Sequence, residues 1–127
     1  MFKSLFGSKK EQRELNWNRL TELSQLNEIE ITSTHKPVVI FKHSTRCGVS
    51  RMVLSQFEAN ADFDEDGVDL YYLDLLNYRE ISNEIAERFQ VHHQSPQMLI
   101  LRDRKVIHYS SHSEITPSII NRILESA

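Results

Sequence analysis

Cysteine is almost absent from this chain of 127 residues, which contains only one, Cys47. A single cysteine cannot close an intramolecular disulfide, so the small secreted proteins that depend on several such bonds are excluded as a class. We therefore expect the chain to work in a reducing compartment, the cytoplasm. Glycine and proline are also scarce, with three of each, and no internal repeat or low-complexity segment is visible.

Long apolar runs and an excess of positive charge are lacking as well. No run approaches the roughly 20 apolar residues that a membrane-spanning helix requires. The net charge is -3, which disfavours a protein that binds nucleic-acid phosphates through a basic face. The length suits one domain that buries its own core without a structural metal. We predict that residues 14–127 form this domain and that residues 1–13 form a flexible basic tail without stable membrane insertion.

The hydrophobic pattern predicts helices and strands in alternation. Residues 15–26 carry apolar side chains at a spacing that indicates a helix. Residues 37–41, PVVIF, form a β-branched run that is typical of a central strand buried on both faces. Further strands are predicted at 68–75, 97–101 and 106–109. The apolar faces of the remaining helices are Val49, Met52, Val53 and Phe57, then Ile81, Ile85 and Phe89, and finally Ile119, Ile120, Ile123 and Leu124.

The resulting order, α-β-α-β-α-β-β-α, predicts an α/β fold of the thioredoxin-like type with an extra N-terminal helix. The βαβ half should be parallel and right-handed, and the ββα half antiparallel. We expect a four-stranded mixed sheet with flanking helices on both faces. Asp103 and Arg104 are predicted to form the hairpin turn, and Thr116 and Pro117 to open the last helix.

Cys47 lies where the first predicted strand gives way to its helix, with Ser44 or Thr45 as the expected N-cap. Binding sites in open α/β sheets gather at the carboxyl ends of strands. The unpaired N–H groups and partial positive charge of a helix N-terminus favour a thiolate over a thiol. The alternative is a buried, inert cysteine, but the small and polar residues that flank Cys47 favour the reactive form.

Side chains close to Cys47 in the sequence are candidates for activating it. The helix dipole alone contributes about 0.3–1 kcal/mol, so direct hydrogen bonds from the hydroxyl of Thr45 or Ser50 are needed as well. Lys42, His43 and Arg46 are expected to add positive potential.

A second candidate feature is Ser95-Pro96, directly before the strand predicted at 97–101. In a thioredoxin-like layout this loop lies beside Cys47. A cis Ser95–Pro96 bond would turn backbone groups of Ser95 toward a peptide or thiol ligand, whereas a trans bond is the ordinary alternative. The six histidines fit no strong metal-ligand spacing, so no metal site is predicted. His43 and His93 are retained as possible tuning residues.

KHSTRCGVSRM (42–52), YYLDLLNYREISNEIAERF (71–89) and VHHQSPQMLIL (91–101) together resemble the monothiol bacilliredoxins, the YtxJ-like thioredoxin-fold proteins. The resemblance extends from Trp17 to the end of the chain. It implies that Cys47 attacks bacillithiol mixed disulfides of client proteins and that Pro96 is the cis-proline. Bacillithiol is then a co-substrate rather than a bound cofactor, and a low-molecular-weight thiol or another redox protein is the reductant. The residues expected to bind the substrate or thiol are Thr45, Arg46, Gly48, Ser50, Ser95 and Pro96.

Two other functions remain open. Gly48 creates C-G-V-S, which is close to the C-G-F-S of monothiol glutaredoxins and therefore indicates a glutathione-ligated [2Fe–2S] carrier. The segments QSP (94–96) and SSHSE (110–114) depart from the corresponding motifs of those glutaredoxins. The third possibility is a non-catalytic binding module, in which the groove beside Pro96 receives an extended peptide.

Overall fold

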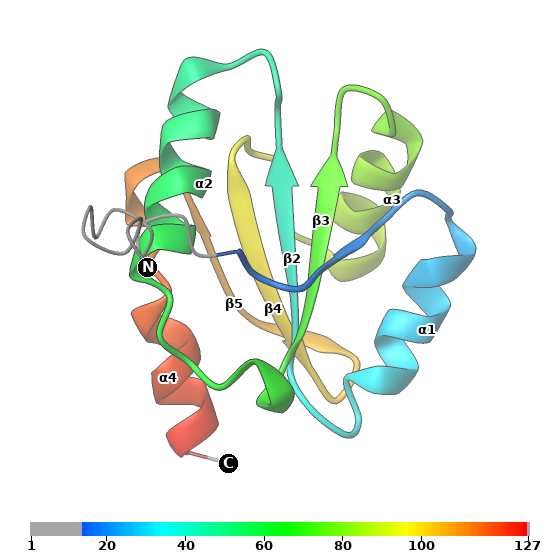
Figure 1. Cartoon of the computed structure of the whole chain (residues 1–127). Helices are drawn as coiled ribbons and strands as arrows, with labels where there is room; N and C mark the ends of the chain where they lie inside the picture. Colours follow the sequence, from blue (N-terminus) through cyan, green and yellow to red (C-terminus); the bar gives the residue numbers. More distant parts are fainter. Residues whose placement is uncertain (1–13, 127) are drawn as a thin grey trace, which may run out of the picture.

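The computed structural model describes residues 14–126, so the predicted tail at 1–13 lies outside the described residues. The described chain is built on a mixed sheet in the order β1-β3-β2-β4-β5 (Figure 1). Strands β1, β3 and β2 are mutually parallel, whereas β4 is antiparallel to β2 and β5 is antiparallel to β4. The strands are β1 (Trp17–Arg19), β2 (Val38–His43), β3 (Asp69–Asp74), β4 (Gln97–Arg102) and β5 (Lys105–Ser111).

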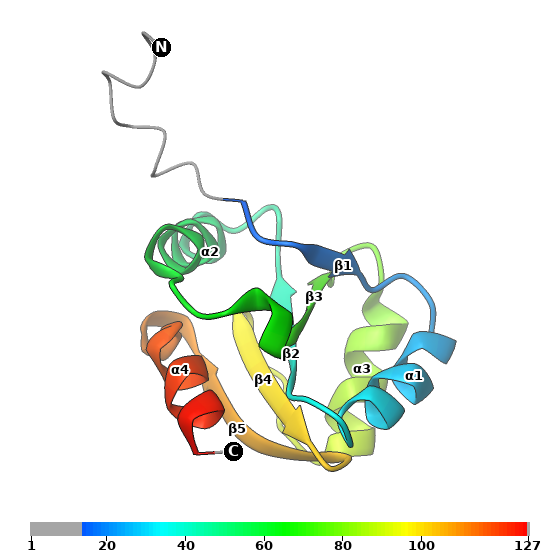
Figure 2. The same cartoon turned by 60° about the horizontal axis from the view of Figure 1, so that its bottom comes forward.

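Helices cover both faces of this sheet, as predicted. Figure 2 shows α2 and α4 on one face and α1 and α3 on the other. Each face has its own apolar core, because successive residues of a buried strand point to opposite sides. The helices are α1 (Ser24–Thr32), α2 (Gly48–Asn60), α3 (Arg79–Phe89) and α4 (Ser118–Glu125), with short 3-10 turns at η3 (Glu65–Gly67) and η4 (His112–Glu114).

Strand β2 lies at the centre of the sheet and is buried along its whole length. Val39 and Phe41 enter the core beneath α2 and α4, whereas Val38 and Ile40 enter the core beneath α1 and α3. The strand continues two residues beyond the predicted apolar run and so buries a lysine and a histidine, Lys42 and His43. Two buried titratable side chains therefore lie at the carboxyl end of β2, close to the start of α2.

The helix predicted at 15–26 is wrong in position. Trp17–Arg19 instead forms β1, a fifth strand parallel to β3, and the helix begins at Ser24. The Trp17 ring packs against Phe41, with 5.9 Å between ring centroids, while Leu15 and Leu20 are buried on either side of the short strand. Apolar spacing alone could not distinguish this strand from a helix, because its pairing partner lies far away in the sequence.

The predicted apolar face of α2 is also wrong in part. Val49 and Met52 are 49% and 53% exposed, and the buried residues of this helix are Ser50, Val53 and Phe57. The helix is thus rotated so that a serine faces the sheet and two apolar side chains near Cys47 face outward.

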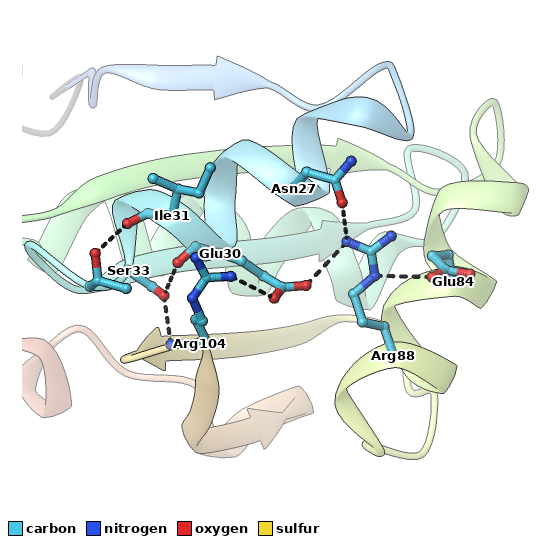
Figure 3. Close-up of polar contacts among 8 residues, drawn as sticks. Asn27, Glu30, Ile31, Ser33, Glu84, Arg88 and Arg104 are labelled. Carbon is cyan, nitrogen blue, oxygen red and sulfur yellow. Dashed lines mark hydrogen bonds and ion pairs between the residues drawn. The ribbon is translucent and has the colours of Figure 1, made fainter.

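The hairpin turn predicted at Asp103 and Arg104 is confirmed, and the end of α1 holds it in place. Both residues have positive φ, 54° and 67°. Their N–H groups donate to the carbonyl oxygen and Oγ of the buried Ser33 at 2.7 and 2.8 Å. Glu30 accepts from Arg88 of α3 at 3.2 Å and pairs with Arg104 at 3.5 Å (Figure 3). This polar cluster joins α1, α3 and the β4–β5 turn.

Candidate functional site

Cys47 is the N-cap of α2 and follows the carboxyl end of β2. The connection from β2 to α2 is at the top of Figure 1. The backbone of Cys47 is extended, with φ -103° and ψ 121°, and its carbonyl accepts the first helical hydrogen bond from the Arg51 N–H at 3.0 Å. The residue is half-buried and carries a free thiol. Cys47 therefore occupies the capping position that was predicted for Ser44 or Thr45, and no side chain caps this helix.

The surface around Cys47 is open. Thr45, Arg46 and Gly48 are exposed, together with the apolar Val49 and Met52 described above. The Arg51 guanidinium donates to the Thr45 carbonyl oxygen at 3.2 Å, which keeps a positive charge beside this loop. A thiol here is thus open to a second molecule, and it lies at the N-terminal end of the α2 helix dipole.

Ser50, three residues after Cys47, is fully buried. Its Oγ accepts from the Ser44 N–H at 3.1 Å and lies 2.8 Å from Nδ1 of His43. The hydroxyl donates to Nδ1 in one tautomer of the histidine ring and accepts from Nδ1–H in the other. The predicted contact of Ser50 with the substrate therefore does not fit its position: the side chain joins α2 to the strand below it.

The electrostatic surroundings of His43 keep its ring neutral. Burial lowers the pKa of His43 below its usual 6.5, the Asp74 carboxylate raises it, and the Arg51 guanidinium lowers it further. The ring also packs against Tyr72, with 5.5 Å between centroids. A neutral imidazole shares the hydrogen bond with Ser50 without a buried charge. Whether His43 tunes Cys47 stays a prediction, since its described hydrogen bond is to Ser50.

The loop 91–96, between α3 and β4, ends in a cis Ser95–Pro96 peptide bond. Pro96 is buried, and its carbonyl oxygen accepts from the His112 N–H at 3.1 Å. Ser95 Oγ is turned into the interior, where it has no hydrogen-bond partner among the described residues. Gln97 is the register partner of Lys42 on β2, so the loop lies at the same end of the sheet as Cys47.

Lys42, which is expected to add positive potential near Cys47, makes its described side-chain contacts on the other face of the sheet. Because alternate strand residues face opposite sides, it points away from the α2 face and toward α3. Its Nζ donates to the Ser82 carbonyl oxygen at 3.2 Å and lies 3.3 Å from Nδ1 of His93, a residue of the loop 91–96. Burial lowers the pKa of Lys42 to about 8. His93, retained above as a possible tuning residue, is an exposed residue whose Nδ1 contacts this lysine.

The sequence model of one family, described as "Monothiol bacilliredoxin BrxC", matches residues 18–120. The chain belongs to the monothiol bacilliredoxin family. A solved structure provisionally assigned as an oxidoreductase with a thioredoxin fold is 27% identical, with a TM-score of 0.68 over 84% of this chain and 91% of that one.

Two thioredoxins show the same fold at lower identity. The thioredoxin of Malassezia sympodialis is 20% identical, with a TM-score of 0.65 over 90% of this chain and 92% of that one. The thioredoxin of Fasciola hepatica is 16% identical, with a TM-score of 0.62 over 86% and 97%. The predicted thioredoxin-like fold is confirmed, and membership of the bacilliredoxin family supports thiol–disulfide redox chemistry.

Two further observations concern the described part of the chain. Among residues 14–126, no three His, Cys, Asp or Glu side chains gather in a way that could hold a metal ion. No helix of the described part is long and apolar enough to cross a membrane.

Two partnerships at the site were missed by the sequence reasoning, His43 with Ser50 and Lys42 with His93. The available signal was strand alternation, which places consecutive residues of β2 on opposite faces. This alternation indicates the face of the sheet to which each side chain points, but it does not identify the residue that the side chain contacts on that face.

Proposed function

We propose that this bacilliredoxin-family protein removes bacillithiol from mixed disulfides of cytoplasmic proteins, with Cys47 as the attacking thiol. The observation that carries the proposal is the position of the chain's single cysteine, half-exposed at the N-terminus of α2 within the matched family region. Thiol–disulfide exchange requires an accessible sulfur that ionises readily, and it requires no metal.

In the proposed step, the Cys47 thiolate attacks the bacillithiol sulfur of the mixed disulfide. A new disulfide forms between Cys47 and bacillithiol, the client–bacillithiol disulfide breaks, and the electron pair leaves on the client sulfur, which then takes up a proton. One disulfide breaks and one forms, so the step needs no outside oxidant or reductant. The exposed Thr45, Arg46 and Gly48 line the side from which a client approaches.

The capped Cys47 must be released by a molecule from outside, because the position three residues later holds Ser50 and not a second thiol. A low-molecular-weight thiol, or the thiol of another redox protein, attacks the capped disulfide and returns Cys47 as a thiolate. Bacillithiol is thus a co-substrate, and no tightly bound cofactor takes part. Bacillithiolated proteins and this external reductant are the proposed partners.

The decisive experiment incubates the reduced protein with a bacillithiolated client and weighs both by mass spectrometry. We expect the client to lose the adduct and Cys47 to gain it, with no transfer in Cys47→Ser. Equal processing of a glutathionylated client would refute the preference for bacillithiol but retain the exchange chemistry. Absence of transfer to Cys47 from either client would favour the binding-module function.

The C-G-V-S motif, which is similar to that of monothiol glutaredoxins, favours one alternative function, a glutathione-ligated [2Fe–2S] carrier. Anaerobic purification from cells separates the two, since a cluster carrier is coloured and the proposed exchange protein is colourless.

A further inference from the structure

Lys42 is an unusual residue for the centre of a sheet. It has no exposed surface, and no carboxylate of the described residues lies within 4 Å of its ammonium group. Burial of an ammonium without an acidic partner disfavours the folded state. Methionine would fill the same space without this cost. A lysine here is therefore explained more readily by what its ammonium group holds than by packing.

The ammonium group holds two different parts of the molecule. It donates to the Ser82 carbonyl oxygen of α3 at 3.2 Å, and it lies 3.3 Å from His93 Nδ1. Ser82 Oγ lies 3.3 Å from the same ring nitrogen. The His93 side chain is thus contacted both by Lys42 of β2 and by Ser82 of α3.

The His93 contact lies three residues before Pro96, where the loop ends in its cis peptide bond. In 91–96, Val91 is packed in the core, and the His92 carbonyl oxygen accepts from Gln97 Nε2 at 3.0 Å. Between His92 and Pro96, the side-chain hydrogen bonds of the described loop are those of His93, and Ser95 Oγ has no partner among the described residues. Loss of the His93 contact would therefore free the segment directly before Pro96.

We propose that Lys42 is a positioning residue for thiol exchange, which through His93 holds the loop 91–96 in place at the end of the sheet that carries Cys47. This inference rests on the proposed function, because the loop ends in the cis Ser95–Pro96 bond at the same end of the sheet as the attacking sulfur. Lys42 itself points away from the α2 face on which Cys47 begins its helix. Its effect is on how a large disulfide substrate fits and not on the reactivity of the sulfur.

The contact has a definite pH window. Burial lowers the pKa of His93 below its usual 6.5, and the charges of Lys42, Arg79 and His92 lower it further. At neutral pH the ring nitrogen is therefore unprotonated and accepts from the Lys42 ammonium. Below the His93 pKa, two cations face each other across 3.3 Å and the contact is lost. The groups facing the pair are Arg79 from α3, His92 from the same loop and the uncharged Ser82.

The test compares Lys42→Met, His93→Asn and, as a matched control, His92→Asn. Asparagine keeps an acceptor near the position of Nδ1 but does not titrate, and His92 is the exposed neighbour without a side-chain contact to Lys42. Three rates are measured: transfer from a bacillithiolated peptide, alkylation of Cys47 by iodoacetamide, and deuterium uptake of the peptide that covers 91–96. The small alkylating reagent reports the sulfur without the loop.

For Lys42→Met we expect kcat/KM for transfer to fall about tenfold, mainly through KM, with alkylation within twofold of wild type. Tenfold is the size expected when one charge-assisted hydrogen bond is lost. Deuterium uptake of 91–96 should rise about tenfold. In wild type and His92→Asn, the ratio of transfer to alkylation should fall as the solution is acidified through the lowered pKa of His93, whereas in His93→Asn it should stay level.

Wild-type transfer kinetics in Lys42→Met would overturn the proposal, as would unchanged uptake at 91–96. A parallel fall of alkylation and transfer would show that Lys42 acts on the sulfur directly, which also overturns it. If the ratio of transfer to alkylation still falls at acidic pH in His93→Asn, the titration of His93 is not the cause of the fall, and this outcome also contradicts the proposal. If wild type transfers glutathione but not bacillithiol, the proposed substrate fails while the same comparison, run with a glutathionylated peptide, still decides this inference.

Discussion

The hydrogen bonds of Ser50 support a quantitative prediction. Ser50→Ala removes the oxygen that accepts from the Ser44 N–H at 3.1 Å and lies 2.8 Å from His43 Nδ1. Since Ser50 and His43 are buried and Ser44 is half-buried, the remaining groups cannot all find water. A buried polar group that loses its partner costs about 1–3 kcal/mol. We expect the free energy of unfolding to fall by about 2 kcal/mol.

Urea denaturation followed by circular dichroism measures this loss, and it is valid if the slope with urea stays unchanged. The control is Ser55→Ala, an exposed serine of the same helix, where alanine should be neutral or stabilising by about 0.5 kcal/mol. The rate of transfer from a bacillithiolated peptide should change by less than threefold in Ser50→Ala, because the side chain does not reach the surface. Equal stabilities of the two variants would refute the hydrogen-bonded arrangement, and a hundredfold loss of transfer would restore Ser50 as a substrate contact.

Three further predictions follow from the same structure. Lys42 titrates near pH 8 when folded and near 10.5 when unfolded, so between these values the unfolded chain holds more protons and stability rises with pH. Between pH 8 and 9.5, the free energy of unfolding of wild type should therefore rise by up to about 2 kcal/mol relative to that of Lys42→Met, as measured by denaturation at each pH. If the stabilities of the two proteins change in parallel with pH, Lys42 is not a buried ammonium. Gly48→Ala should stabilise the start of α2 by about 0.5–1 kcal/mol, because a Cβ there meets only the flexible end of Arg51 at 3.9 Å; a lower melting temperature would contradict this. Ser33→Ala should cost about 1–3 kcal/mol, because the Arg104 N–H loses its acceptor in the β4–β5 turn, whereas exposed Thr34→Ala should cost less than 0.5; equal losses would show that the turn does not depend on Ser33.

Much of the architecture followed from local signals. The β-branched run at 37–41 indicated the central strand, and the change of period after Cys47 indicated the helix that begins there. The thioredoxin-like layout that this order predicts placed Cys47 beside the loop that holds Pro96. By contrast, Trp17 was assigned to a helix, because nothing near it in the sequence reveals its pairing with Leu70.

The sequence by itself determined which residues are available for chemistry: one thiol at a strand–helix junction, a proline before an antiparallel strand, and a lysine and a histidine at the end of the central strand. Only the tertiary structure decided how they are used. It turned Ser50 inward onto His43 and directed Lys42 across the sheet to His93, while it left Cys47 open. The physical reason is that hydrophobic periodicity records how deeply a residue is buried, whereas the partner of a buried polar group comes from a distant segment that only folding brings into contact.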